Sequence, residues 1–192
     1  MIGAFSRSGG VFRAHLSSDY NLLLRRLIRE ILVILDDPGP RAVGPMVAAS
    51  TSFESGRDAP EERALGHLLP AMSAEPELAA NLREMTEDGL RADKSARLRR
   101  IDEALGRVGD GAVELTIPEE DVWDWLGAFN DVRLGLAGEL GLDSDEDAER
   151  IADLASAAPT GGRDQSAAAI YMLLTWWQDS LLLAMKSGAR DN

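Results

Sequence analysis

Four polar side chains lie at helix positions where the apolar spacing of three and four residues predicts core. They are Glu87, Lys94, Arg133 and Gln178. Arg133, for example, follows Phe129 by four residues and precedes Leu136 by three. A buried charge is costly unless it is paired and hydrogen-bonded. We therefore expect these groups to meet in a buried or half-buried network, in which Arg133 bridges to Glu87, Gln178 lies nearby and Asn130 contributes.

Two roles are open for this network. In the first, it is structural and sets the register of the helices, as paired polar groups in protein cores commonly do. In the second, Lys94 and Arg133 form an anion pocket. We favour the structural role. A fully exposed Arg133 would contradict both readings, whereas an unpaired Arg133 that faces a cavity would favour the pocket.

A second set of residues is a candidate partner surface: Arg91, Arg97, Arg100 and Trp176. The three arginines belong to a basic stretch, but on a helical wheel its cations scatter, and acidic residues lie between them. An ordinary solvated face is therefore favoured over nucleic-acid contact. Trp176 and its neighbour Trp177 point to different faces of one helix, so we expect one in the core and the other near the surface. Tryptophan is enriched at binding hot spots.

The sequence shows none of the residue patterns that mark common catalytic and metal sites. The chain has no cysteine, which excludes disulfides and thiol chemistry within it. Its two histidines, His15 and His67, have no ligand-spaced partner, so we expect no metal site. Nucleophile-elbow, phosphate-loop and dinucleotide-binding motifs are also absent from the sequence. We expect a protein that is not an enzyme and carries no cofactor.

Charge narrows the class of partner. The formal net charge of −13 repels phosphate backbones, which disfavours direct nucleic-acid binding and favours protein partners. No apolar run approaches the roughly 20 residues that span a bilayer, so no membrane association is expected. The first residues lack the basic and apolar regions of a signal peptide, and a cytoplasmic location is the default.

The elements that must position these residues are mostly helices. Amphipathic spacing predicts helices at about 20–35, 61–69, 75–108, 118–140, 145–156 and 164–185. A hairpin of residues 2–6 and 11–16 and a strand near Val113 complete a mainly α fold, a bundle of about five helices with a small antiparallel sheet. Within 75–108 the apolar face moves near Gly89, through a kink or through different packing partners of the two halves.

The length suits one domain that covers residues 1–192, with a flexible loop rich in Pro, Gly and Ser at about 38–60. The last helix is apolar on most sides. It suits either the centre of a bundle or the seam of a homodimer.

Three segments resemble a known family in their order and spacing. They are Leu82-Arg83-x-x-Thr86-Glu87-x-x-Leu90-Arg91-x-x-Lys94, Trp125-Leu126-x-x-Phe129-Asn130-Asp131-Val132-Arg133-Leu134, and Leu174-Thr175-Trp176-Trp177-Gln178-x-x-Leu181. They are similar to those of the actinobacterial oxidative-stress regulator (AosR) family, long catalogued only as a domain of unknown function. The N-terminal hairpin and the first helix also fit, so the resemblance covers nearly the whole chain.

The resemblance implies a transcriptional regulator of the oxidative-stress response, linked to cysteine biosynthesis, that contacts a sigma factor or RNA polymerase. It also implies gene neighbours that include a Clp protease adaptor. Redox sensing in the family is thought to use cysteines, so that step is not carried over to this chain. The leading expectation is a regulator that works by protein–protein contact. The alternative is a helical adaptor or ligand-binding module with no direct role in transcription.

Overall fold

The computed structural model describes residues 2–36, 63–107, 113–158, 160 and 162–188. In chain order its elements are β1 (Ser6–Ser8), β2 (Val11–Leu16), α1 (Ser18–Asp36), α3 (Arg63–Leu68), α4 (Pro76–Arg107), β3 (Val113–Pro118), the 3-10 helix η1 (Glu119–Asp121), α5 (Val122–Leu140), α6 (Asp145–Ser156) and α7 (Arg163–Gly188). The mainly α fold with a small sheet is therefore confirmed. The described ranges contain six α-helices, one at each of the six predicted helical ranges, although the bundle was expected to have about five. The loop predicted at about 38–60 lies outside the described residues.

The sheet is antiparallel, with the strand order β1-β2-β3. The β1–β2 turn uses Gly9 and Gly10, whose φ angles of 61° and 76° suit the tight turn of a two-residue hairpin. The predicted strand near Val113 pairs along all of β2, as expected. The first strand, however, covers residues 6–8 rather than 2–6, and Ile2 contributes only an isolated bridge to Leu16.

The residues that precede β1 form no regular strand, and two of them bind α7. The carbonyl of Gly3 accepts a hydrogen bond from Trp177 Nε1 at 2.9 Å, and the amide of Phe5 donates to Ser180 Oγ at 3.2 Å. The Gly3 amide still donates to the carbonyl of His15 on β2 at 2.8 Å, so this segment remains beside β2, but regular strand pairing begins only at Ser6. These hydrogen bonds join the N-terminal segment to the C-terminal helix, although nearly the whole chain lies between them in the sequence.

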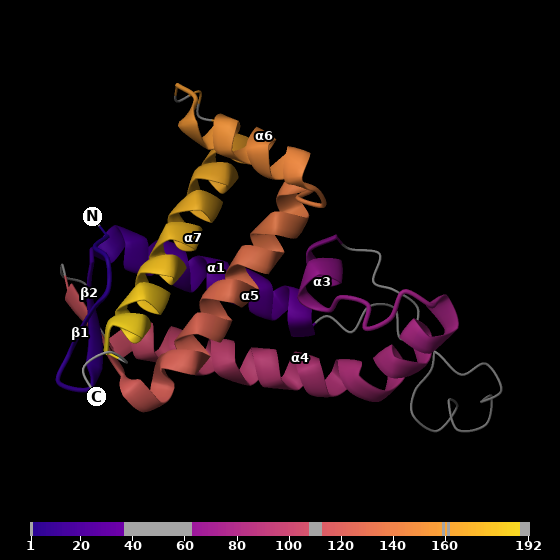
Figure 1. Cartoon of the computed structure of the whole chain (residues 1–192), viewed down its shortest axis with the longest axis horizontal. Helices are drawn as coiled ribbons and strands as arrows, with labels where there is room; N and C mark the ends of the chain where they lie inside the picture. The colour runs from indigo at the N-terminus through magenta and orange to yellow at the C-terminus, as the bar shows by residue number, and fades with distance from the viewer. Residues whose placement is uncertain (1, 37–62, 108–112, 159, 161, 189–192) are drawn as a thin grey trace.

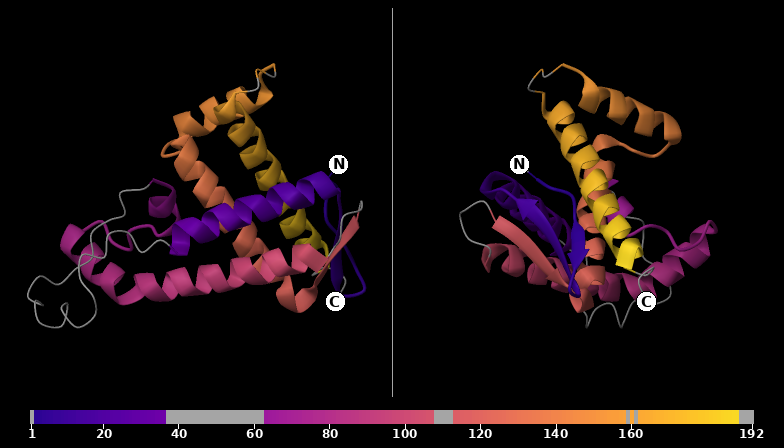
Figure 2. Two further views of the ribbon diagram at one scale, coloured as in Figure 1. Left: turned by 180° about the vertical axis from the view of Figure 1, so that it is seen from behind. Right: turned by 60° about the vertical axis from the view of Figure 1, so that its left-hand side comes forward.

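The helices form crossed pairs, as Figure 1 and Figure 2 show. Helices α1 and α4 lie side by side, and the antiparallel α5 and α7 cross over them. Helix α6 covers the ends of α5 and α7 that lie farthest from α4, while the sheet lies at the opposite end of α7. This arrangement puts α4 and α7 on different sides of α5 and so places polar groups of α5 against both.

An aromatic cluster occupies the core where α5, α7 and the N-terminal segment meet. The rings of Phe5 and Trp177 are stacked with centroids 5.0 Å apart, and Phe129 lies 4.8 Å from Trp177 and 5.8 Å from Trp125. All four side chains are buried. Such pairs contribute about 0.5–1.5 kcal/mol each beyond their buried area. The cluster makes the α5–α7 pair a rigid base for the polar groups that project from it.

Helix α4 runs without interruption through Gly89, and its two halves contact different partners. The first half packs against residues 69–72, and the second half against α1 and α5. Helix α3 approaches α5 closely because Gly138 has no side chain: a Cβ there would lie 2.5 Å from Ala64 Cα. Within the described residues, no helix combines the length and apolar character that a membrane crossing requires.

Candidate functional site

Asp131 on α5 lies at the centre of a group of ion pairs between α4 and α5, and it is only 1% exposed. Its carboxylate accepts a hydrogen bond from Lys94 through Oδ1 and another from Arg97 Nη1, 3.1 Å away, through Oδ2. Both cations project from α4, three residues apart and therefore on one face of that helix. A buried carboxylate is thus compensated by two cations, which links α4 to α5.

The same ion pairs continue outward along α4. Arg97 Nε also lies 3.9 Å from Asp124, and Arg100 donates to Asp124 over 2.6 Å. Gly127 makes room for this arrangement, because a Cβ at that position would lie 2.5 Å from Arg97 Nη1. We call Lys94, Arg97, Arg100, Asp124 and Asp131 the α4–α5 ion cluster. Each cation in it contacts a carboxylate, as a structural network requires.

Arg133 occupies a separate polar site between α5 and α7. Its Nε donates to Thr175 Oγ1 at 3.0 Å, its Nη1 to Gln178 Oε1 at 2.8 Å, and its Nη2 to the Tyr171 hydroxyl at 3.4 Å. The guanidinium also lies 5.4 Å from the centre of the Tyr171 ring, within the range of a cation–π contact. We call these four residues the α5–α7 polar cluster. The predicted proximity of Arg133 and Gln178 is confirmed.

The predicted bridge from Arg133 to Glu87 is wrong, and Lys94 and Arg133 do not share an anion pocket. The reason is the rotation of the helix. Asp131 and Arg133 are two residues apart, which places them about 200° apart around α5. Asp131 therefore faces α4, where Lys94 meets it, while Arg133 faces α7.

Glu87 is 3% exposed and finds its cations on its own helix. Arg91, one turn later, donates to Glu87 Oε1 from Nε at 2.9 Å, and Arg83 Nε lies 3.6 Å from Oε2. Arg91 also donates from Nη1 to the carbonyl of Leu35, near the C-terminal end of α1, at 2.9 Å. This group holds α1 against α4 and is distinct from both clusters.

Asn130 is half-buried, and within the described residues its side chain has no hydrogen bond that would join it to either cluster.

Asp131 was not among the residues predicted from the sequence. Its signal was available, because it lies three residues after Ala128 and four before Gly135 on a helix otherwise rich in apolar residues. This spacing places Asp131 on the buried face of α5, so it predicts a buried carboxylate as clearly as the spacing around Arg133 predicts its inward position.

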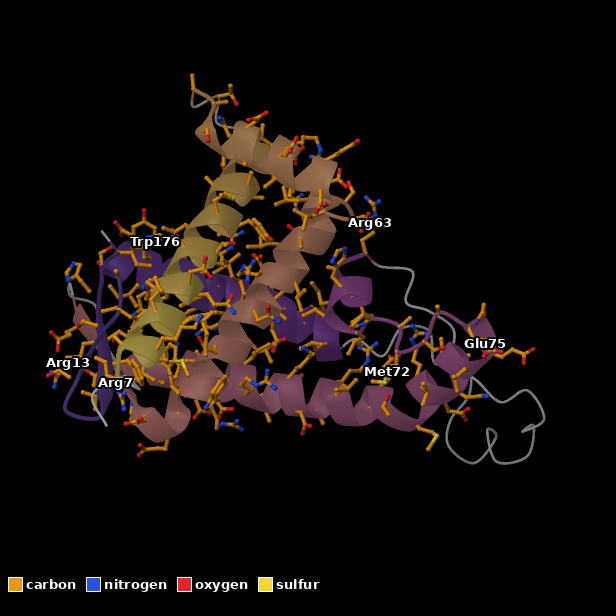
Figure 3. All side chains as sticks on the ribbon, viewed as in Figure 1. Arg7, Arg13, Arg63, Met72, Glu75 and Trp176 are labelled. Carbon is orange, nitrogen blue, oxygen red and sulfur yellow. The ribbon has the colours of Figure 1, made fainter. Side chains whose placement is uncertain are left out.

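The predicted partner surface is divided by the structure. The side chains of Arg91 and Arg97 are 11% and 24% exposed and are held in the ion pairs described above. Arg100 is 58% exposed but contacts Asp124. Trp176 is 45% exposed and Trp177 only 1%, so the expected division of the two tryptophans is confirmed. Figure 3 shows Trp176 on the side of α7 that faces away from α5.

A lowered pKa is found at the start of α6. Ser144 is the N-cap, and its hydroxyl donates to Asp147 Oδ2 at 2.8 Å while accepting from the Asp147 amide at 3.2 Å. The pair is a variant of the capping box, because the Asp147 carboxylate accepts from the Ser144 hydroxyl and from the Asp143 amide rather than from the Ser144 amide. The hydrogen bond from Ser144, with those from Arg150 and the Asp143 amide, lowers the pKa of Asp147 from 3.8 to about 2. Among the described residues, no three histidine, aspartate or glutamate side chains gather in a way that could hold a metal ion.

Comparison with known proteins identifies a family. A family model described as a domain of unknown function, DUF2017, matches residues 2–185. No curated protein and no solved structure matches the chain. The match includes both clusters and every helix that positions them.

Proposed function

Since the chain belongs to the DUF2017 family, a domain of unknown function, we propose that it is a non-enzymatic regulator that acts through protein–protein contact in the cytoplasm. The proposed process is transcription in the oxidative-stress response, and the proposed partner is a sigma factor or RNA polymerase. The process and the partner come from the resemblance of three segments to the oxidative-stress regulator family. The proposed contact surface rests on exposed apolar side chains of the chain itself.

The observation that carries the proposal is an apolar stripe on the outer face of α7. Met172, Trp176 and Leu183 are 40%, 45% and 66% exposed, and they follow one another at helical spacings of four and seven residues. Large apolar side chains that share one exposed face are typical of interaction surfaces, and tryptophan is the residue most enriched among binding hot spots. We call these three residues the α7 stripe.

The interior supports a binding role over a catalytic one. In the α4–α5 ion cluster each of the three cations contacts one of the two carboxylates, so these charges are engaged in joining helices. Because the chain has no cysteine, the proposed regulator receives its oxidative signal from a partner and does not form a disulfide within itself.

The test is affinity capture from an actinobacterial lysate after chemical crosslinking, with mass spectrometry of the captured proteins. The purified chain is compared with Trp176→Ser and with the matched control Trp123→Ser, which replaces another exposed tryptophan, 71% exposed on α5. We expect a sigma factor or RNA polymerase with the unaltered chain and the control, and a loss with Trp176→Ser. Clp components without polymerase or sigma factor would instead support the adaptor function, and equal capture by all three proteins would remove the α7 stripe as the contact.

A further inference from the structure

Arg133 differs from the other half-buried arginines in the described ranges. Each of the others lies within 4.0 Å of a carboxylate: Arg7 of Glu119, Arg25 of Asp102, Arg83 and Arg91 of Glu87, and Arg97 of Asp131. The side-chain partners of Arg133 are the neutral oxygens of Thr175, Gln178 and Tyr171. The chain has 33 acidic and 20 basic side chains, so a half-buried guanidinium without a carboxylate is not explained by a shortage of acids.

The polar groups around Arg133 also have more hydrogen-bond donors than acceptors. Gln178 uses its oxygen to accept from Arg133, which leaves its amide Nε2 as a donor. Thr175 accepts from Arg133 and donates its own proton to the carbonyl of Tyr171 at 2.8 Å. Each Nη of Arg133 has a second N–H, and the Tyr171 hydroxyl has its proton. Within the described part of the chain, none of these remaining donors meets an acceptor in the structure.

We propose that the α5–α7 polar cluster binds one carboxylate group, with Arg133 as the cation and Tyr171 and Gln178 as additional donors. A carboxylate fits because its two oxygens match the fork of a guanidinium and its single charge balances the single cation. Phosphate, with a charge nearer −2, would leave an excess of negative charge inside a chain of net charge −13.

The source of the carboxylate follows from the position of the cluster, and this step rests on the proposed function. Thr175 and Trp176 are consecutive on α7, so their side chains leave the helix about 100° apart, and the cluster and the α7 stripe lie on adjacent faces of α7. A partner that covers the stripe and extends onto the adjacent face would reach Arg133 with an aspartate or glutamate side chain. A free small carboxylate offers the same chemistry without the apolar contact, and the experiment separates the two sources.

The experiment is an NMR titration that follows the Nε–Hε resonance of Arg133 in the purified full chain. The probes are acetate, inorganic phosphate and a blocked Leu-Glu-Leu tripeptide whose only carboxylate is the glutamate side chain, all at constant ionic strength. We expect acetate to shift the Arg133 resonance with millimolar affinity and to leave that of Arg25, already paired with Asp102, unchanged. Replacing the tripeptide glutamate with glutamine should abolish its effect.

Three variants test the assignment of the donors. Arg133→Met should weaken acetate binding about tenfold or more, because the charge-assisted hydrogen bonds are lost. Arg133→Lys should restore binding only in part, since an ammonium lacks the fork of donors. Tyr171→Phe removes one hydroxyl and keeps the ring, so it provides a readout even if Arg133→Met fails to fold. For each variant, binding is read from the resonances of neighbouring backbone amides.

The outcomes separate this inference from the proposed function. Tripeptide binding that is about tenfold tighter than that of acetate, and reduced by Trp176→Ser, supports a partner's side chain as the source. Acetate binding equal to or tighter than that of the tripeptide supports the site with a free carboxylate as its ligand. No shift of Arg133 with either probe, or tighter binding of phosphate than of acetate, overturns the inference. These measurements need only the purified chain, so a failure to capture a sigma factor would leave them unaffected.

Discussion

Replacing Asp131 with asparagine should destabilise the fold more than any other single change in the α4–α5 ion cluster. The substitution keeps the shape of the side chain and removes its charge, so Lys94 and Arg97 lose the carboxylate that compensates them. Removing one member of a buried ion pair costs about 3–5 kcal/mol. Lys94 and Arg97 remain 16% and 24% exposed and can turn partly to water. We therefore expect a loss of about 2–3 kcal/mol in the free energy of unfolding.

The measurement is urea unfolding followed by circular dichroism and tryptophan fluorescence. With a denaturant dependence of about 2 kcal/mol per molar urea, the midpoint should fall by about 1–1.5 M. The matched control is Asp124→Asn, which removes a carboxylate that is 40% exposed and should cost less than about 1 kcal/mol. Equal losses for the two variants would show that burial of Asp131 does not govern the energy of the cluster. That result would refute the reasoning.

Three further outcomes follow from the same geometry. Gly138→Ala should destabilise the contact of α3 with α5, because the new Cβ would lie 2.5 Å from Ala64 Cα. Gly89→Ala, whose Cβ would meet nothing within 4 Å, should instead stabilise α4 by about 0.5–1 kcal/mol. Thermal unfolding of the two variants compares these effects. The carboxyl of Asp147 should titrate near pH 2 by NMR, and Ser144→Ala should return its pKa toward 3.8. Because the folded-state pKa of Asp147 is the lower one, its contribution to stability is present above about pH 4 and is lost as the pH falls toward 2, a dependence that Asp147→Asn should remove.

Local signals in the sequence predicted several elements closely. The acidic helix at residues 145–156 has the predicted bounds, because a serine N-cap and acids in the first turn define a helix start without tertiary contacts. Gly9 and Gly10 predicted the hairpin turn, since their positive φ angles are open to glycine at no steric cost. The first strand was placed too early, because Gly3 and Phe5 bind side chains of α7, 174 and 175 residues away along the chain.

The candidate site was predicted only in part. Helical periodicity correctly indicated that Arg133 and Gln178 lie inward and hydrogen-bonded, and that Lys94 belongs to a half-buried polar network. It did not indicate that Asp131 is the carboxylate that pairs with Lys94. The prediction left out Asp131, and it paired Glu87 with Arg133 although cations one turn away on the same helix as Glu87 were nearer.

The sequence by itself determined which residues share a face of one helix, where most helices begin and end, that the chain carries a large negative charge and that it contains no thiol. The tertiary structure decided which faces meet. The pairing of Lys94 with Asp131, and the placement of Arg133 among neutral acceptors on α7, depend on how α5 is rotated relative to both neighbours. That rotation is set by the packing of the aromatic cluster and by glycines such as Gly127 that admit a neighbouring side chain, and these long-range contacts leave no periodic trace in any single helix.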